Sequence, residues 1–148
     1  MTIKNIFLTV ILLMSSVQAA SAQLTDKVIK ERIAQMVENI FKSQRPDGSW
    51  RVKNHPVGET SLCVLALSTA GVTVKDPRLQ KAMLYLENHF PTDFTYSMAL
   101  YACALQTVNA KRYQKLIRKT VDWFTFHQIK CSWDYKGQRA GDNSTTQF

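Results

Sequence analysis

The sequence has few residues that could bind a metal ion, and they stand in no metal-binding pattern. Its cysteines, Cys63, Cys103 and Cys131, form no Cys-x-x-Cys motif, and its three histidines are scattered. Because zinc sites need Cys and His at short, fixed spacings, we predict no metal site and no cofactor.

An odd number of cysteines also excludes a complete set of intramolecular disulfides. Cys63 and Cys103 lie in apolar stretches, so we expect buried thiols that are not bonded to each other.

The sequence also lacks low-complexity tracts, and its N-terminal apolar run is too short to cross a membrane. This run, 6–14, follows Lys4 and precedes the small residues Ala20-Ser21-Ala22. A bilayer core of about 30 Å needs a longer run, whereas the Ala-x-Ala ending is typical of a secretory signal peptide. A single retained anchor is the alternative. We therefore predict a signal peptide over 1–22, cleavage near Ala22, and one exported domain over 23–148 in the periplasm or outside the cell.

Acidic residues are scarce beside basic ones, with 11 against 19, which gives the chain a formal net charge of +8. The basic residues are spread along helical patterns, and the densest group is Lys111, Arg112, Lys115, Arg118 and Lys119. Such spacing suits solvated helix faces. The alternative is attraction of these basic helices to anionic headgroups at a membrane surface. Nucleic acid is disfavoured as a partner by the export signal.

The pattern of apolar residues predicts an all-α domain in which two kinds of helix alternate. Amphipathic patterns cover 28–41, 79–90 and 113–124, while 61–67 and 97–105 are apolar all round. A helix that is apolar on every side is expected to be enclosed by other helices. The alternation therefore predicts stacked helical hairpins with an outer and an inner layer.

A turn motif joins the first outer pattern to the first inner one. It begins at Gln44, contains Pro46 and Gly48, and ends at Trp50. Proline presets φ and glycine accepts a positive φ, so the chain can reverse here. A shorter version, without the glycine, runs 128–133. We predict that each Gln and Trp pair pins one hairpin to the next.

Acids or hydroxyl residues precede each inner segment. They include Glu59, Asp93 with Tyr96, and Asp142. One interpretation is helix capping and compensation of the helix dipole. The other is that these ends converge on the mouth of a cavity, where the acids could act on a ligand.

These motifs resemble the prenyltransferase and squalene-oxidase repeats of the terpenoid-cyclase α/α toroid. Gln44, Gly48 and Trp50 match the Gln-x-x-x-Gly-x-Trp repeat of that family, and the stretch from Gln128 to Trp133 is an irregular second copy. Residues 141–148 resemble the opening of a further inner helix in squalene-cyclase-like bacterial proteins. The resemblance implies part of a toroid, about half a barrel, in which the Gln and Trp residues are structural.

The catalytic residues of that family are not found. The Asp-x-Asp-Asp motif of hopene-type cyclases, the Asp-Cys-Thr-Ala-Glu stretch of sterol cyclases and the zinc ligands of protein prenyltransferases are all absent from the sequence. We therefore expect a binding or scaffold module for a lipid or polyprenoid, a glycan or a protein. The alternatives are part of a polyprenoid cyclase or prenyltransferase whose catalytic residues lie outside this chain, and a toroidal carbohydrate-active enzyme. An incomplete toroid would expose apolar inner surface, so we also expect self-association.

Overall fold

The computed structural model describes residues 25–91, 94–128 and 133, which contain helices and no strand. The predicted all-α fold class is therefore confirmed for this part of the chain. In order, the helices are α2 (Asp26–Lys42), α3 (Pro56–Thr69), α4 (Pro77–Asn88), α5 (Thr95–Asn109) and α6 (Gln114–Phe126). The predicted signal peptide lies outside the described residues.

The chain divides at Ile33, inside α2, into two compact units. In the first unit, the described residues belong mainly to the opening turns of α2, where Val28, Ile29 and Ile33 are each about two-fifths exposed. The second unit, from Ala34 onward, contains the rest of α2 and the other four helices.

The helix ends follow the turn chemistry of the sequence. Asp76 caps α4, because its side chain accepts a hydrogen bond from the backbone N–H of Arg78 at 2.8 Å, and Pro77 occupies the first turn. Helix α3 ends before Gly71, which has φ +90° and donates its N–H to the carbonyl of Ser68. A glycine with positive φ just beyond a helix lets the chain turn so that backbone N–H groups reach the last carbonyls, which accounts for the end of α3.

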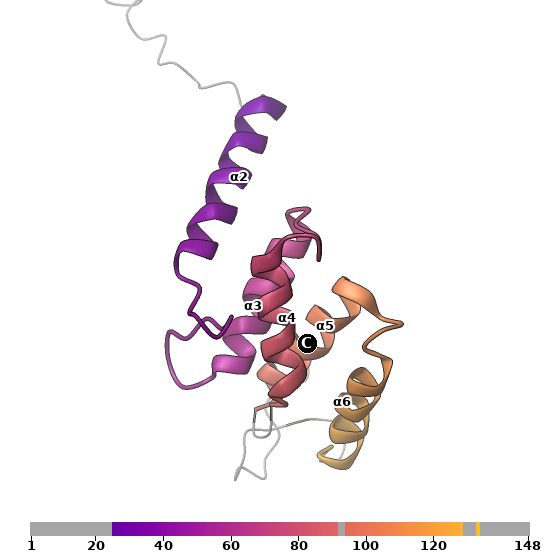
Figure 1. Cartoon of the computed structure of the whole chain (residues 1–148). Coiled ribbons are helices and arrows are strands. Elements are labelled where there is room, and N and C mark those ends of the chain that lie inside the picture. The colour runs from indigo at the N-terminus through magenta and orange to yellow at the C-terminus, as the bar shows by residue number, and fades with distance from the viewer. Residues whose placement is uncertain (1–24, 92–93, 129–132, 134–148) are drawn as a thin grey trace, which may run out of the picture. The chain divides into compact units, whose positions relative to one another are not determined.

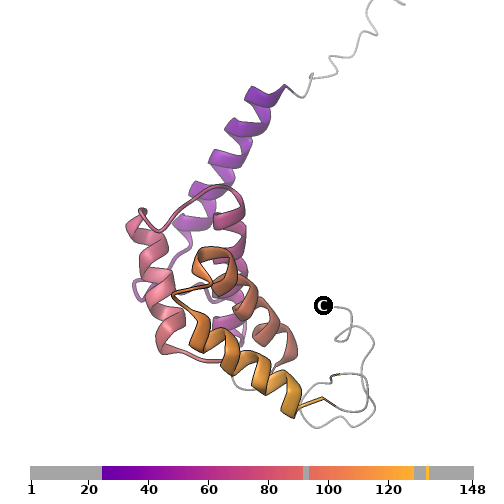
Figure 2. The ribbon, with the colours of Figure 1, turned by 90° about the vertical axis from the view of Figure 1, so that its right-hand side faces the viewer.

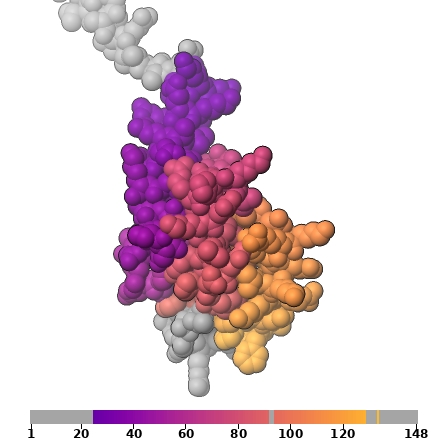
Figure 3. Space-filling view, viewed as in Figure 1, coloured from indigo at the N-terminus to yellow at the C-terminus, as the bar shows by residue number. Residues whose placement is uncertain are grey.

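In the second unit, α3 and α5 pack along each other, α4 packs on α3, and α6 packs on α5 (Figures 1 and 2). The core contains the fully buried side chains of Leu67, Leu79, Leu86, Tyr101 and Leu105. The space-filling view shows α4 covering the middle of one face of this unit (Figure 3). The arrangement is that of helical hairpins sharing one core.

Tyr101 links two of these helices and is sealed from solvent. Its hydroxyl donates to the Leu86 carbonyl at 3.0 Å, and its ring meets the edge of Phe90. Burial raises the pKa of Tyr101 to about 12. The carbonyl belongs to the last turn of α4, so this bond holds the end of an outer helix against α5.

The expectation that the inner helices are enclosed on all sides is wrong for one side of each. In α3, Leu62 is 53% exposed and Ala66 is also exposed. In α5, Cys103 is exposed and Ala99 is half-buried. The physical reason is that α3 packs on α4 and α5, and α5 on α3 and α6, which leaves an apolar side of each helix open to solvent.

Helices α4 and α6 each end beside a histidine whose ring stacks on the aromatic side chain four residues earlier. At the end of α4, the His89 ring stacks on Tyr85 at 4.1 Å, and its Nδ1 lies 2.8 Å from the Tyr85 carbonyl oxygen. At the end of α6, the His127 ring stacks on Trp123 at 4.2 Å, and its Nδ1 lies 2.9 Å from the Trp123 carbonyl oxygen. The Trp123 carbonyl also accepts the backbone N–H of His127 at 2.9 Å, so the ring adds a second contact at this helix end.

Candidate functional site

The first turn motif fastens the end of α2 to the start of α4. The Gln44 side-chain amide donates to the carbonyls of Gly48 at 3.0 Å and Arg78 at 2.9 Å. Gly48 has φ +91°, and a Cβ placed on it would lie 2.4 Å from the carbonyl oxygen of Lys81. Only glycine lets the turn approach α4 this closely, because any side chain would strike that carbonyl.

Trp50 connects the same turn to α2 and α3. Its indole N–H donates to the Ile40 carbonyl at 2.8 Å, and its backbone N–H donates to the Thr60 hydroxyl at 3.0 Å. The side chain is 3% exposed and lies beside the Phe41 ring. These contacts are those of a packing residue at a joint between helices.

The second turn motif keeps the indole contact in spite of its shorter loop. Trp133 donates its indole N–H to the Phe124 carbonyl at 2.7 Å and meets the Phe124 ring edge-on at 5.8 Å. In both motifs the accepting carbonyl stands four places before the Gln. Gln128 itself is exposed, and residues 129–132, including Cys131, lie outside the described part.

The acids predicted at a cavity mouth are only partly described. Glu59 lies in the first turn of α3, and its carboxylate accepts hydrogen bonds from the backbone N–H groups of Val52 and Lys53. It therefore holds the loop before α3 and is not a side-chain cap, since α3 has none. Tyr96 is the second residue of α5 and is half-buried. Asp93 and Asp142 lie outside the described residues.

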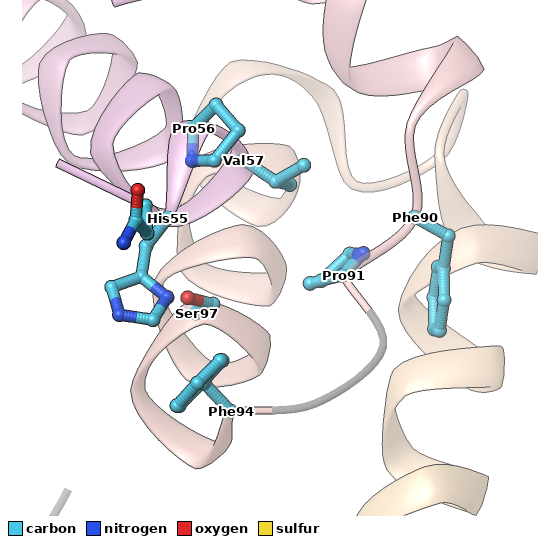
Figure 4. A pocket seen from close by; sticks show the side chains of 9 residues that line it. His55, Pro56, Val57, Phe90, Pro91, Phe94 and Ser97 are labelled. Carbon is cyan, nitrogen blue, oxygen red and sulfur yellow. The ribbon is translucent and has the colours of Figure 1, made fainter. Parts of the chain in front are cut away.

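The starts of α3 and α5 meet at a pocket of about 160 Å³ (Figure 4). Its lining includes His55, Val57 and Gly58 from the start of α3, and Phe94 and Ser97 from the start of α5. Neither Glu59 nor Tyr96 is among the described residues that line it. The sequence interpretation missed these lining residues. The one available signal was Gly58, an isolated glycine inside a helical pattern, which often marks close packing.

The described thiols differ in environment. Cys63 and Cys103 are both free, as predicted, but Cys103 is exposed, so the prediction of a buried thiol is wrong there. Burial, with a smaller effect of the Glu59 charge, raises the pKa of Cys63 to about 11. Cys63 is therefore a poor nucleophile at neutral pH, because the thiolate is the reactive form.

Several basic residues of the outer helices are paired. Arg78 forms ion pairs with Glu38 at 2.9 Å and Asp76 at 2.8 Å, and its guanidinium lies over the Phe41 ring. Hydrogen bonds from Arg78 lower the pKa of both carboxyls. Arg112, in the turn between α5 and α6, pairs with Glu87 of α4 at 2.9 Å. The pairs with Glu38 and Glu87 connect separate segments of the chain, so part of the basic charge has a structural role.

Within the described ranges, no group of three or more His, Cys, Asp or Glu residues is placed to hold a metal ion. None of the helices described is long and apolar enough to span a bilayer. In comparisons with known proteins, no family model, curated protein or solved structure matches this chain.

Proposed function

We propose that the chain is an exported binding module of the toroid-repeat kind, which takes up an apolar chain such as a polyprenoid on the open sides of its inner helices. The observation that carries this proposal is the exposure of Leu62 and Cys103 within helices whose sequence is apolar all round. These two residues belong to α3 and α5, which pack along each other, and apolar surface exposed on neighbouring helices is a candidate binding surface. The resemblance of the Gln44, Gly48 and Trp50 motif to squalene-cyclase-like repeats supports the same class of ligand.

The charge distribution favours an apolar ligand over a glycan or a charged protein. Helix α5 contains no charged residue, and α3 contains only Glu59, whereas the whole chain carries a formal net charge of +8. A surface without charges gives little orientation to a polar partner. Burial of apolar area stabilises the bound state of an apolar ligand by roughly 25 cal/mol for each Å² that is removed from water.

Binding is favoured over turnover by the contacts of Glu59, the one acid in the described inner helices. Its two carboxylate oxygens accept hydrogen bonds from the backbone N–H groups of Val52 and Lys53. Glu59 is therefore engaged in holding the loop before α3, and it does not line the pocket at the start of that helix.

Alkylation of Cys103 tests the proposal. A polyprenol such as farnesol should slow the reaction of Cys103 with a maleimide, measured as the labelled peptide by mass spectrometry. Cys63 serves as an internal reference, because its raised pKa keeps its own reaction slow. No protection of Cys103 at saturating farnesol would refute binding on this side of α5.

Two variants separate the ligand from a second copy of the chain. Leu62→Lys should abolish farnesol protection, while Ala110→Lys, a change beyond the end of α5, should leave it intact. If the parent chain forms concentration-dependent oligomers that Leu62→Lys dissociates, and farnesol has no effect, the surface serves self-association. Conversion of farnesol or squalene to a cyclised product would instead favour an enzyme of the polyprenoid-cyclase class.

A further inference from the structure

The pocket at the starts of α3 and α5 presents hydrogen-bond donors that have no acceptor within the described part of the chain. The side chain of Ser97 is more than nine-tenths buried, yet its hydroxyl has no hydrogen-bond partner there. The backbone N–H groups of Val57 and Gly58 stand in the first turn of α3, where no intrahelical acceptor exists and no side chain caps the helix. Figure 4 shows the Ser97 hydroxyl directed toward the space beside the His55 ring.

Gly58 allows α3 to approach Ser97 of α5 closely beside the pocket. A Cβ added to it would lie 2.5 Å from the Ser97 hydroxyl oxygen and 3.1 Å from the Ser97 Cβ. Any side chain at position 58 would therefore displace the hydroxyl or separate the two helices. Glycine therefore allows the close approach of the two helices.

One part of the pocket lining is apolar, and another part is polar. The apolar part includes Phe90, Pro91 and Phe94, and Phe94 meets the His55 ring edge-on at 4.1 Å. Asn54 and His55 belong to the polar part. The volume of about 160 Å³ is close to the ~150 Å³ of an engineered protein cavity that takes up benzene. A ligand that fits would therefore combine one acceptor group with an apolar part about the size of a single aromatic ring.

We propose that this pocket binds a small carboxylic acid, with its carboxylate at the donors of Val57, Gly58 and Ser97 and its apolar part against Phe90 and Phe94. A helix N-terminus favours a negative charge, and the N–H groups of Val57 and Gly58 belong to the first turn of α3, next to this pocket. The nearby carboxylate of Glu59 is already bonded to the backbone of the preceding loop. This site is separate from the polyprenoid surface proposed above.

Titrations followed by ¹H–¹⁵N NMR test the ligand class on the purified chain. Benzoate should shift the amide signals of Val57, Gly58 and Ser97 in a saturable way. Benzamide, its neutral analogue, should bind roughly tenfold more weakly, because hydrogen bonds to charged groups are stronger than those to neutral ones. Inorganic phosphate should also bind more weakly, since it leaves the apolar walls uncovered. Equal affinity for benzoate and benzamide would overturn the assignment of a carboxylate site.

Two serine variants locate the site. Ser97→Ala should weaken benzoate binding by roughly tenfold through the loss of one donor to a charged group. Ser68→Ala is the matched control, because its buried hydroxyl also has no partner in the described structure but lines a different pocket. Both substitutions remove a single oxygen and should leave the fold intact. If the two variants bind benzoate equally, or if the parent chain shows no shifts at these amides, the proposal fails. Such a failure would leave the protection of Cys103 by farnesol unaffected.

Discussion

The two turn motifs, each a joint between an outer helix and the residues that follow it, form the same indole hydrogen bond but differ in the residues around it. Trp50 and Trp133 both donate an indole N–H to a carbonyl in the last turn of an outer helix, over sequence separations of 10 and 9 residues. Only at the first joint do the described residues include a glycine pressed against a further outer helix and a Gln amide bound to two carbonyls. The comparison teaches that the indole hydrogen bond tolerates a change in loop length, and that at the first joint the Gln and the glycine add contacts with α4.

Removal of each indole gives the largest expected effect. Trp50→Ala should lower the free energy of unfolding by roughly 3–5 kcal/mol, because it removes a buried side chain at the contact between α2 and α3. Trp133→Ala should cost about 1–2 kcal/mol, because Trp133 is only half-buried. Urea denaturation of both variants measures the difference. Equal losses would show that the two joints contribute alike.

Much of this architecture could be predicted because its causes are local. Helical periodicity and the turn residues around Gly71 and Asp76 identify the helices and their ends. The pocket and the open sides could not be predicted, since they depend on which distant residues meet. Gly58 against Ser97 is an example, and the exposure of Leu62 is another. A sequence apolar on all sides indicates that a helix can be enclosed, and it does not show whether its neighbours cover every side.

The glycine of the first joint can be tested against a second glycine of similar conformation. Gly48→Ala should destabilise the fold by about 2–4 kcal/mol, since the new methyl group meets the Lys81 carbonyl and the backbone has φ +91°. Gly71→Ala has the same conformational strain, at φ +90°, but no described atom within 4 Å of the added carbon, so it should cost about 1–2 kcal/mol. If Gly71→Ala is as damaging as Gly48→Ala in urea denaturation, the close approach to α4 has no energetic importance.

The two Gln residues sharpen the comparison further. Gln44→Ala leaves the carbonyls of Gly48 and Arg78 without their donor and should cost about 1–2 kcal/mol. Gln128 is exposed, so Gln128→Ala should change stability by less than about 0.5 kcal/mol. Thermal melts of the two variants, made side by side, decide whether the second Gln contributes to its joint. A loss at Gln128 equal to that at Gln44 would contradict the expectation.

The smallest expected effect is an acid sensitivity confined to the first joint. Asp47 accepts hydrogen bonds from the Ser49 hydroxyl at 2.7 Å and from the Ser49 backbone N–H at 3.0 Å, and these bonds lower its pKa. A carboxyl with a lowered pKa in the folded state stabilises the fold above its unfolded pKa, and this contribution is lost as the pH falls through the folded value. Melting temperatures between pH 6 and pH 3 should therefore fall slightly more for the parent than for Asp47→Asn. Parallel curves would exclude a role for this carboxylate.

The stacked pair at the end of α6 has an optical consequence. The Trp123 indole lies flat against the His127 imidazole at 4.2 Å, and this stacking requires an intact last turn of α6. Emission from Trp123 should therefore change when the last turn opens, whereas Trp50 lies beside Phe41 and Trp133 beside Phe124. The last turn of α6 thus carries its own fluorescent indicator of helix fraying, a few residues from the second joint.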